Sequence, residues 1–334
     1  MAITNSALPF ILEKASTIWP GSMTEADFIP QFGAVKAVAE QQTARVSYAN
    51  LPDQADAKIT WINNCDITVD TCADDCDFTG VAADTSVQTI EITQCKQSTF
   101  SEPIDAWRGN LFGLADALAV DINKTMKAQL ETVAQYVVSI LNSSAGTNEY
   151  DNQGEFTIAG TDTTIPAAAW TDTGIFGKLR RTAIKNRFDM PYLLTGDSLD
   201  QMVYMARTSS QNGEGKGDNV RIGEFPLYTD LFNIEAVNTT EYVTYLINKG
   251  AIAFASKAYH PTTPEVLGGT MTRFSISNRF FPMLKHDVEF VEKCTSGVWA
   301  IHYRIKARYD VFLNPTGCTS TRKGVLKLIR ETGV

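Results

Sequence analysis

Residues 120–141, VDINKTMKAQLETVAQYVVSIL, decide the fold of this 334-residue chain. The stretch is rich in strong helix formers, and it lies inside an apolar repeat that runs from about Pro103 to about Asn142. The repeat takes ten steps over 36 residues, or 3.6 residues per step, at Ile104, Trp107, Leu111, Leu114, Leu118, Ile122, Met126, Leu130, Val133, Val137 and Ile140. A period of 3.6 keeps an apolar stripe on one side of a straight helix, whereas a strict heptad repeat winds the helix into a supercoil. We therefore predict one straight helix over residues 103–142, about 60 Å long at 1.5 Å per residue.

This helix is not expected to cross a membrane. Charged side chains interrupt it throughout, at Asp116, Asp121, Lys124, Lys127 and Glu131, so that no apolar window of about 18 residues exists. A rod longer than most compact domains belongs to a broad, flat molecule or bridges two parts of one. We expect the long strands of the chain to bury its core stripe, which comprises Trp107, Leu111, Leu114, Leu118, Ile122, Met126, Leu130, Val133 and Val137.

Composition indicates an ordered, acidic protein. The chain is 44% hydrophobic and 20% charged, and its net charge is −9, which argues against sequence-specific nucleic-acid recognition through a basic face. The N-terminus lacks the basic start and small-residue cleavage site of a signal peptide, so we expect a protein that is used without secretion. Six cysteines in this length do not make a disulfide scaffold.

Charge is unevenly distributed along the chain. Residues 46–100 hold nine carboxylates against two lysines, and residues 299–330 hold seven cations against Asp310 alone. The acidic region is too highly charged to pack on itself, so we expect it to lie on a basic partner surface. Candidate contacts between subunits join Asp66, Asp70, Asp74, Asp75 and Asp77 to Arg304, Lys306 and Arg308. The alternatives are a solvated basic stripe and ion pairs within one subunit.

The order of elements predicts an α+β protein. Residues 1–45 resemble an arm, and residues 46–100 alternate apolar with polar side chains, as strands separated by acidic turns do. The long helix follows within residues 101–164, then a compact α+β module at 165–260, and long strands return in 261–334. The stretch RIGEFPLYTDLFNIEAV (221–237) is predicted to be extended. GVWAIHYRIKARYDVFL (297–313) alternates over a strand about 50 Å long at 3.3 Å per residue.

Two patterns could carry catalytic chemistry, and neither fits it well. NGEGKGDN (212–219) is rich in glycine, but a helix is expected before it and a strand after it, the reverse of a phosphate loop. His286 and Asp287, with His260, His302 and Asp310, suggest a metal-dependent hydrolase, yet HDVEFVEK alternates as a strand does. We therefore expect no enzyme, no cofactor and no catalytic metal.

The cysteines of the acidic region leave alternatives open. Cys65, Cys72, Cys76 and Cys95 lie in one region, but only Cys72 and Cys76 have a spacing that structural zinc prefers. We expect free thiols, with zinc and a disulfide as the alternatives.

The succession of parts resembles the major capsid protein of tailed double-stranded-DNA phages, which has the Hong Kong 97 fold. The likeness covers most of the chain and rests on the helix Pro103–Asn142, MPYLLTGDSLDQMVYMAR, GEFPLYTDLFNIEAV, LINKGAIAFASKAY and the strand Val298–Leu313. The resemblance implies that the helix is the spine of a peripheral domain with residues 101–164, that 46–100 form an extended loop lying on a neighbour, and that 165–260 form an axial domain. Residues 261–334 would return to the peripheral domain and end in a C-terminal tail.

The resemblance also implies partners. Copies of the chain would form hexamers and pentamers of an icosahedral head around packaged DNA that is bound without sequence specificity. A separate scaffolding protein, a portal and head-decoration proteins would be further partners, with assembly in the host cytoplasm and a final place in the virion. Two alternatives remain: an encapsulin-like bacterial nanocompartment shell and a hydrolase that uses His286 and Asp287.

Overall fold

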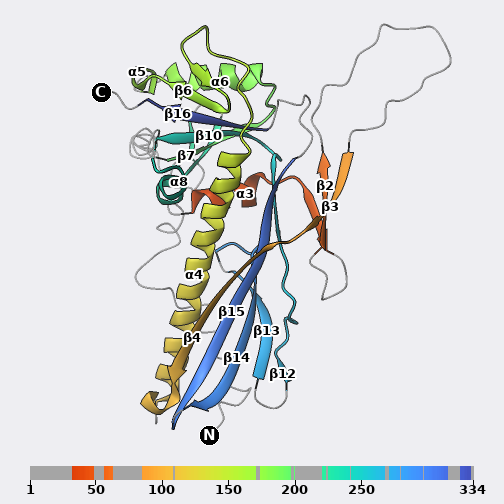
Figure 1. The fold of residues 1–334 in the computed structure, drawn as a ribbon, viewed down its shortest axis with the longest axis vertical. Coiled ribbons are helices and arrows are strands. Elements are labelled where there is room, and N and C mark those ends of the chain that lie inside the picture. Colours follow the sequence, from red (N-terminus) through yellow and green to blue (C-terminus); the bar gives the residue numbers. More distant parts are fainter. Residues whose placement is uncertain are drawn as a thin grey trace, which may run out of the picture.

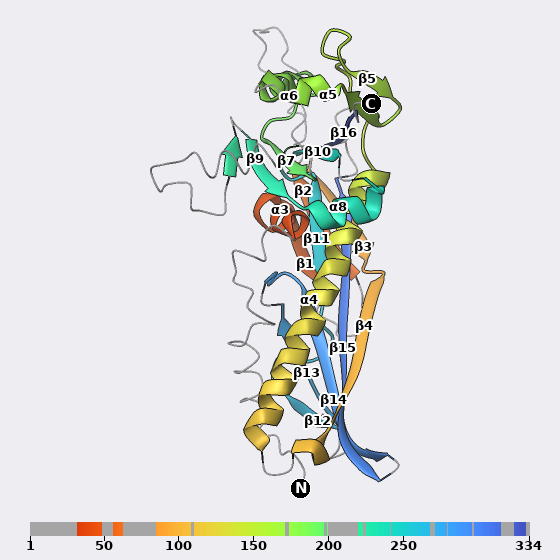
Figure 2. The same cartoon turned by 90° about the vertical axis from the view of Figure 1, so that its left-hand side faces the viewer.

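A computed structural model gives the fold. It describes residues 32–48, 56–62, 85–107, 110–170, 174–196, 199, 220–222, 225–240, 242–267, 271–278, 280–295, 297–314 and 324–331. The molecule is elongated: one long helix lies beside long strands in one half, and a second sheet with short helices forms the other end (Figures 1 and 2). In the part of the chain that is described, no helix is long and apolar enough to span a membrane.

The long half is built on a six-stranded sheet. Its strand order is β11 (Ile252–Ser256), β15 (Val298–Leu313), β14 (Lys285–Thr295), β13 (Met271–Ser277) and β12 (Glu265–Leu267), and β4 (Gln94–Pro103) also pairs with β15. All of these pairings are antiparallel. Along β15 the inner side chains Ile301, Tyr303, Ile305, Ala307 and Tyr309 are buried. The alternation expected for this strand is therefore present, and its even-numbered residues form the opposite, outer face of the sheet.

The long helix is α4 (Leu111–Ser143), which contacts β15 and β4 and runs beside them in both views (Figures 1 and 2). Its 33 residues correspond to about 50 Å. The first half of its stripe packs in one core with Phe274, Val288 and Ile305. The second half packs in another core with side chains of α3, α8, the second sheet, and β11 and β15 of the six-stranded sheet. The helix therefore bridges two cores: β15 packs against its stripe in both of them, and α3, α8 and the second sheet also cover the second half.

The expected start of the helix at Pro103 is wrong. Residues up to Pro103 belong to β4, whose register pairs Pro103 with Ala300, and a 3-10 turn, η2 (Ile104–Trp107), follows. Helix α4 begins after Asn110, whose side-chain oxygen accepts a hydrogen bond of 2.9 Å from the amide of Gly113. Pro103 was interpreted as the first residue of a helix, but the long-range pairing with β15 decides the conformation of this segment.

The other end holds a seven-stranded sheet in the order β5 (Thr157–Ala159), β6 (Asp162–Ile165), β16 (Val325–Arg330), β10 (Val243–Asn248), β7 (Pro191–Thr195), β9 (Phe225–Thr229) and β8 (Val220–Ile222). Helices α5 (Ala167–Trp170) and α6 (Gly174–Lys185) lie beside it (Figure 1). Residues 231–238, predicted as extended, form helix α8 (Leu231–Asn238), because the Asp230 side chain caps it by accepting from the Asn233 amide.

A small antiparallel sheet joins β1 (Arg45–Tyr48), β2 (Asp56–Ile62) and β3 (Thr85–Glu91). Helix α3 (Gly33–Gln41) precedes it and buries Ala34, Val35, Ala37 and Val38 in the same core as the second half of α4. The Asp230 carboxylate accepts a hydrogen bond of 2.9 Å from the Ala34 amide and so ties α3 to the start of α8. Residues 32–41 are thus part of the body, whereas an arm was expected.

The sheets divide the chain differently from the expected bounds. Strand β11 lies within residues 165–260 but belongs to the six-stranded sheet, and β16 comes from the C-terminal region but pairs with β10 and β6. Strand β4 overlaps the region expected to be a loop yet pairs along β15.

Candidate functional site

The predicted basic residues lie on the outer face of the six-stranded sheet. Cross-strand register aligns Glu265, Arg273, Glu289 and Arg304 on four neighbouring strands, so that positive and negative side chains alternate across the sheet. Arg273 contacts Glu265 at 2.9 Å, and Arg304 forms an ion pair with Glu289. We call these four residues the charge row. Opposite charges placed directly across strands stabilise the pairing of those strands.

Glu289 is the centre of the charge row. Its carboxylate accepts hydrogen bonds from His260 Nε2 at 2.8 Å and Lys306 Nζ at 3.0 Å, besides the pair with Arg304. Burial opposes ionisation of this carboxyl group, but the hydrogen bonds from His260, Lys306 and Arg304 outweigh burial and lower the pKa of Glu289 to about 2. The group is therefore charged at any neutral pH.

Asp287 holds the third predicted cation. Its carboxylate is almost fully buried and accepts from the amides of Tyr259 and His260 at 2.9 Å each, and from Arg308 at 2.5 Å. The Arg308 guanidinium also lies over the Tyr259 ring, 4.2 Å from its centroid. Arg308 is thus held both by a charge-assisted hydrogen bond and by a cation–π contact.

These contacts bear on the expected pairing between subunits. Arg304, Lys306 and Arg308 each have a carboxylate partner on β14 of the same chain, which is the arrangement that the alternative of pairing within one subunit described. Asp66, Asp70, Asp74, Asp75 and Asp77 lie outside the described residues. Sequence reasoning missed Glu289 and Asp287 as partners because their alignment with β15 depends on strand register.

His286 and Asp287 do not converge on a metal. As neighbours on one strand they point to opposite faces. His286 is fully buried, and its Nδ1 lies 2.8 Å from Gln129 Oε1 and its Nε2 lies 3.1 Å from Asn278 Nδ2. Burial lowers the pKa of His286 to about 4, so the ring is neutral at pH 7. Within the described residues, no group of three or more His, Cys, Asp or Glu side chains could hold a metal ion.

The His286 ring belongs to a buried polar network between α4 and the sheet. Gln129 of α4 donates from Nε2 to the Ile305 carbonyl at 2.9 Å and accepts from His286, while Asn278 also approaches the Met126 carbonyl at 3.4 Å. Both ring nitrogens of His286 therefore have partners, and the network fixes the position of α4 along β14 and β15.

The predicted core stripe of the long helix is placed as follows. Seven of its side chains are buried: Leu114, Leu118, Ile122, Met126, Leu130, Val133 and Val137. The side chains of Trp107 and Leu111 lie outside the described part of the chain. Lys124 is exposed, with its ammonium 3.8 Å from Asp121.

The remaining candidates fall partly outside the structure's description. Residues 212–219, Cys65, Cys72 and Cys76 are not described, and Cys95 and Cys294 are exposed free thiols. At the end of the molecule with the seven-stranded sheet, a cavity of about 370 Å³ lies between α6, β7, β9 and α3. No sequence pattern pointed to this cavity, because four separate segments form it.

No family model and no curated protein sequence matches the chain. Among solved structures, a chain of the Cyanophage A-1(L) capsid asymmetric unit matches with a TM-score of 0.50 and 10% identity, over 93% of this chain and 94% of that chain. Chains from Mycobacterium phage Cain (TM-score 0.46, 12% identity, 97% and 98% covered) and Mycobacterium phage Adephagia (0.44, 11%, 100% of both) also match. The cyanophage match confirms the predicted α+β, Hong Kong 97-like fold over nearly the whole chain.

Proposed function

We propose that this chain is the major capsid subunit of a tailed double-stranded-DNA phage, a structural protein without catalytic activity. Copies of it would form the hexamers and pentamers of an icosahedral head that encloses packaged DNA. The observation that carries the proposal is the fold shared with the Cyanophage A-1(L) capsid chain over 93% of this chain. The elongated shape, with one helix bridging two cores, suits a thin subunit that tiles a shell.

The partners and location follow from this role. A scaffolding protein, a portal and decoration proteins would join the head, which would assemble in the host cytoplasm and end in the virion. The packaged DNA would be bound without sequence specificity, as the net charge of −9 suggests. An encapsulin-like shell protein would share the fold, but no observation here favours it. His286 contacts Gln129 and Asp287 accepts from the Tyr259 amide, so the two side chains do not share a site as a hydrolase would require.

Assembly of the purified chain tests the proposal. Size-exclusion chromatography with light scattering, followed by negative-stain microscopy, should reveal capsomers, shells or tubes. Metal analysis of the same sample distinguishes a capsid subunit from the alternative, a metal-dependent hydrolase. A chain that stays monomeric at every concentration, and that carries stoichiometric metal, contradicts the proposed function.

A further inference from the structure

Strand β4 is the longest strand at a sheet edge in the part of the chain that is described. It has ten residues, whereas the strands at the ends of the three sheets have between three and seven. Among the described strands only β15 pairs with it, and Figure 2 shows β4 along one margin of the long half, with β15 on its inner side. Alternate residues of an antiparallel strand direct their backbone N–H and C=O groups away from the partner. The outer edge of β4 therefore offers a row of backbone groups about 33 Å long, at 3.3 Å per residue.

The sequence of β4 does not block this edge. Native proteins protect edge strands with proline, β-bulges, clustered charges or very short strands. The register with β15 pairs all ten residues without a break, from Gln94 to Pro103, so no bulge interrupts β4. Its one proline stands at the last position, and its two charged residues, Lys96 and Glu102, lie near opposite ends. The middle of the strand is therefore open to the addition of a further strand.

Side chains on the α4 side of β4 already have contacts within the subunit. Phe100 stacks on Tyr303, with ring centroids 4.9 Å apart, and packs against the core under α4. Gln129 of α4 approaches Ser98 Oγ at 3.5 Å. Strand addition leaves these contacts in place, because it uses the backbone groups at the edge of the sheet. A partner can therefore bind in the plane of the sheet without displacing α4.

We propose that β4 pairs with β4 of a second copy of this chain, antiparallel and about a two-fold axis at Thr99. Such a contact is isologous, since the same edge serves both subunits. It would join two six-stranded sheets into one continuous sheet across the subunit boundary. The inference rests on the proposed function, because it assigns one contact between assembled subunits.

The charges of β4 select both this partner and this register. Lys96 and Glu102 each lie three residues from Thr99, and their even spacing puts them on one face of the strand. The pairing therefore sets Lys96 opposite Glu102 of the partner subunit, and the two-fold axis repeats this ion pair. Opposite charges that face each other directly across strands stabilise the pairing. A shift of two residues in either direction removes both ion pairs, because each charge then faces an uncharged residue.

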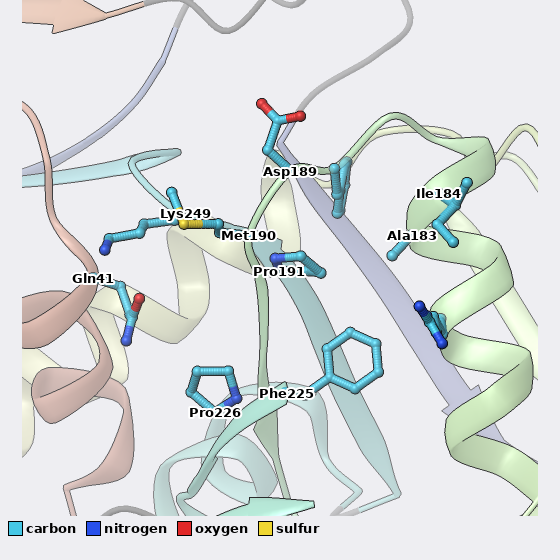
Figure 3. A pocket seen from close by; sticks show the side chains of 11 residues that line it. Gln41, Ala183, Ile184, Asp189, Met190, Pro191, Phe225, Pro226 and Lys249 are labelled. Carbon is cyan, nitrogen blue, oxygen red and sulfur yellow. The ribbon is translucent and has the colours of Figure 1, made fainter. Parts of the chain in front are cut away.

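Crosslinking at the axis tests the pairing. In a chain whose six native cysteines are replaced by serine, Thr99→Cys should form a covalent dimer on oxidation or with a short bismaleimide. Directly opposite side chains have Cβ atoms only about 5 Å apart. Gln97→Cys, exposed on the same face, should not crosslink alone, because its two copies are about 13 Å apart along the strands. Mixed with Ser101→Cys, which it faces across the axis, it should crosslink. Met190→Cys, 58% exposed at the cavity beside α6 in the other end of the molecule (Figure 3), should stay uncrosslinked and controls for random collision.

Charge reversal tests the register without cysteines. Lys96→Glu and Glu102→Lys each replace two ion pairs by two like-charge pairs, so each variant alone should associate roughly tenfold more weakly in light scattering. An equimolar mixture of the two should associate like the wild type, because every glutamate then faces a lysine of the other variant. Lys124→Glu, an exposed residue of α4, makes the same change in net charge as Lys96→Glu and should associate like the wild type. Circular dichroism should show that each variant is folded.

The outcomes separate this contact from the proposed function. If the wild type assembles but Thr99→Cys yields no covalent dimer, the pairing is refuted and the proposed function stands; an extended segment of another protein is then the partner to seek for this edge. The pairing is also refuted if Gln97→Cys or Met190→Cys crosslinks as fast as Thr99→Cys, or if the mixture of charge variants does not recover. A wild type that forms no oligomer at any concentration contradicts the proposed function as well.

Discussion

His286 is a neutral imidazole at the centre of the contact between α4 and the sheet. The unfolded chain has an ordinary histidine pKa of about 6.5, whereas burial lowers the pKa of His286 in the folded protein to about 4. Between these pH values the unfolded state binds the proton and the folded state does not. This group therefore makes the free energy of unfolding rise from pH 4 to 6.5 and adds no slope above or below that window.

The predicted size of that change is roughly 3 kcal/mol, and urea denaturation from pH 4 to 7 measures it. His286→Gln is the matched variant, because glutamine can still donate and accept but does not titrate. Its unfolding free energy should lack this part of the pH dependence. Identical slopes for the two proteins would show that His286 does not carry it.

The two faces of α4 differ in a way that single residues can test. Leu118 is fully buried against Ile301, Tyr303 and Ile305, whereas Lys124 is exposed. Leu118→Ala should lower the free energy of unfolding by about 2–5 kcal/mol, because it removes buried methyl groups and leaves a cavity. Lys124→Ala should change it by less than about 0.5 kcal/mol. Equal losses in chemical denaturation would contradict the orientation of the helix.

At the scale of elements, the ion pairs along β14 and β15 differ in value. The Arg304 side chain is 45% exposed, so its pair with Glu289 should contribute about 0–1 kcal/mol. Asp287 is 1% exposed, and Arg308→Met leaves a buried carboxylate with only two backbone amides. Arg308→Met should therefore cost about 1–3 kcal/mol, and Arg304→Met clearly less. Thermal denaturation of the two variants checks the order, and a larger loss for Arg304→Met would overturn it.

Periodicity predicted elements whose faces are set by local pattern. The 3.6-residue repeat placed the side chains of Leu114 to Val137 on one side of α4, and alternation placed Tyr303 and Arg304 on opposite faces of β15. Periodicity failed where long-range strand pairing or helix capping decides the secondary structure. Pro103 ends a strand that is paired with β15, and Asp230 starts a helix in a stretch rich in apolar and aromatic residues. The partners of Arg304 and Arg308 were likewise hidden, because strand register is not visible in one sequence.

At the scale of the whole molecule, two cores share one helix. The first half of α4 packs on the six-stranded sheet, and the second half packs with β11 and β15 of that sheet together with α3 and the strands of the other end. The 3.6-residue apolar repeat continues through both cores without interruption. The sequence therefore predicts the helix but not the boundary between the two cores. Strand β16 is a second example of what the sequence does not predict. It begins at Val325, 77 residues after the nearest other strand of its sheet, β10, ends at Asn248.

The end of the molecule opposite the seven-stranded sheet carries exposed apolar side chains. Strands β14 and β15 extend past the last β4 pair, Ala300 with Pro103, and there Val298 and Trp299 are 47% and 48% exposed. An isolated subunit gains nothing from exposing a tryptophan, whereas a second copy of the chain could bury it on assembly.

Trp299→Ala should therefore leave the subunit folded, with its free energy of unfolding lowered by less than about 1 kcal/mol, but reduce the yield of assembled particles. Light scattering at several concentrations should show the midpoint of assembly at higher protein concentration, by about tenfold or more if the side chain is an interface hot spot. Ile184→Ala, which removes a similarly exposed apolar side chain on α6 at the far end of the molecule, serves as the comparison. If Trp299→Ala assembles at the wild-type concentration, the tip of this hairpin stays in solvent and the subunits associate elsewhere.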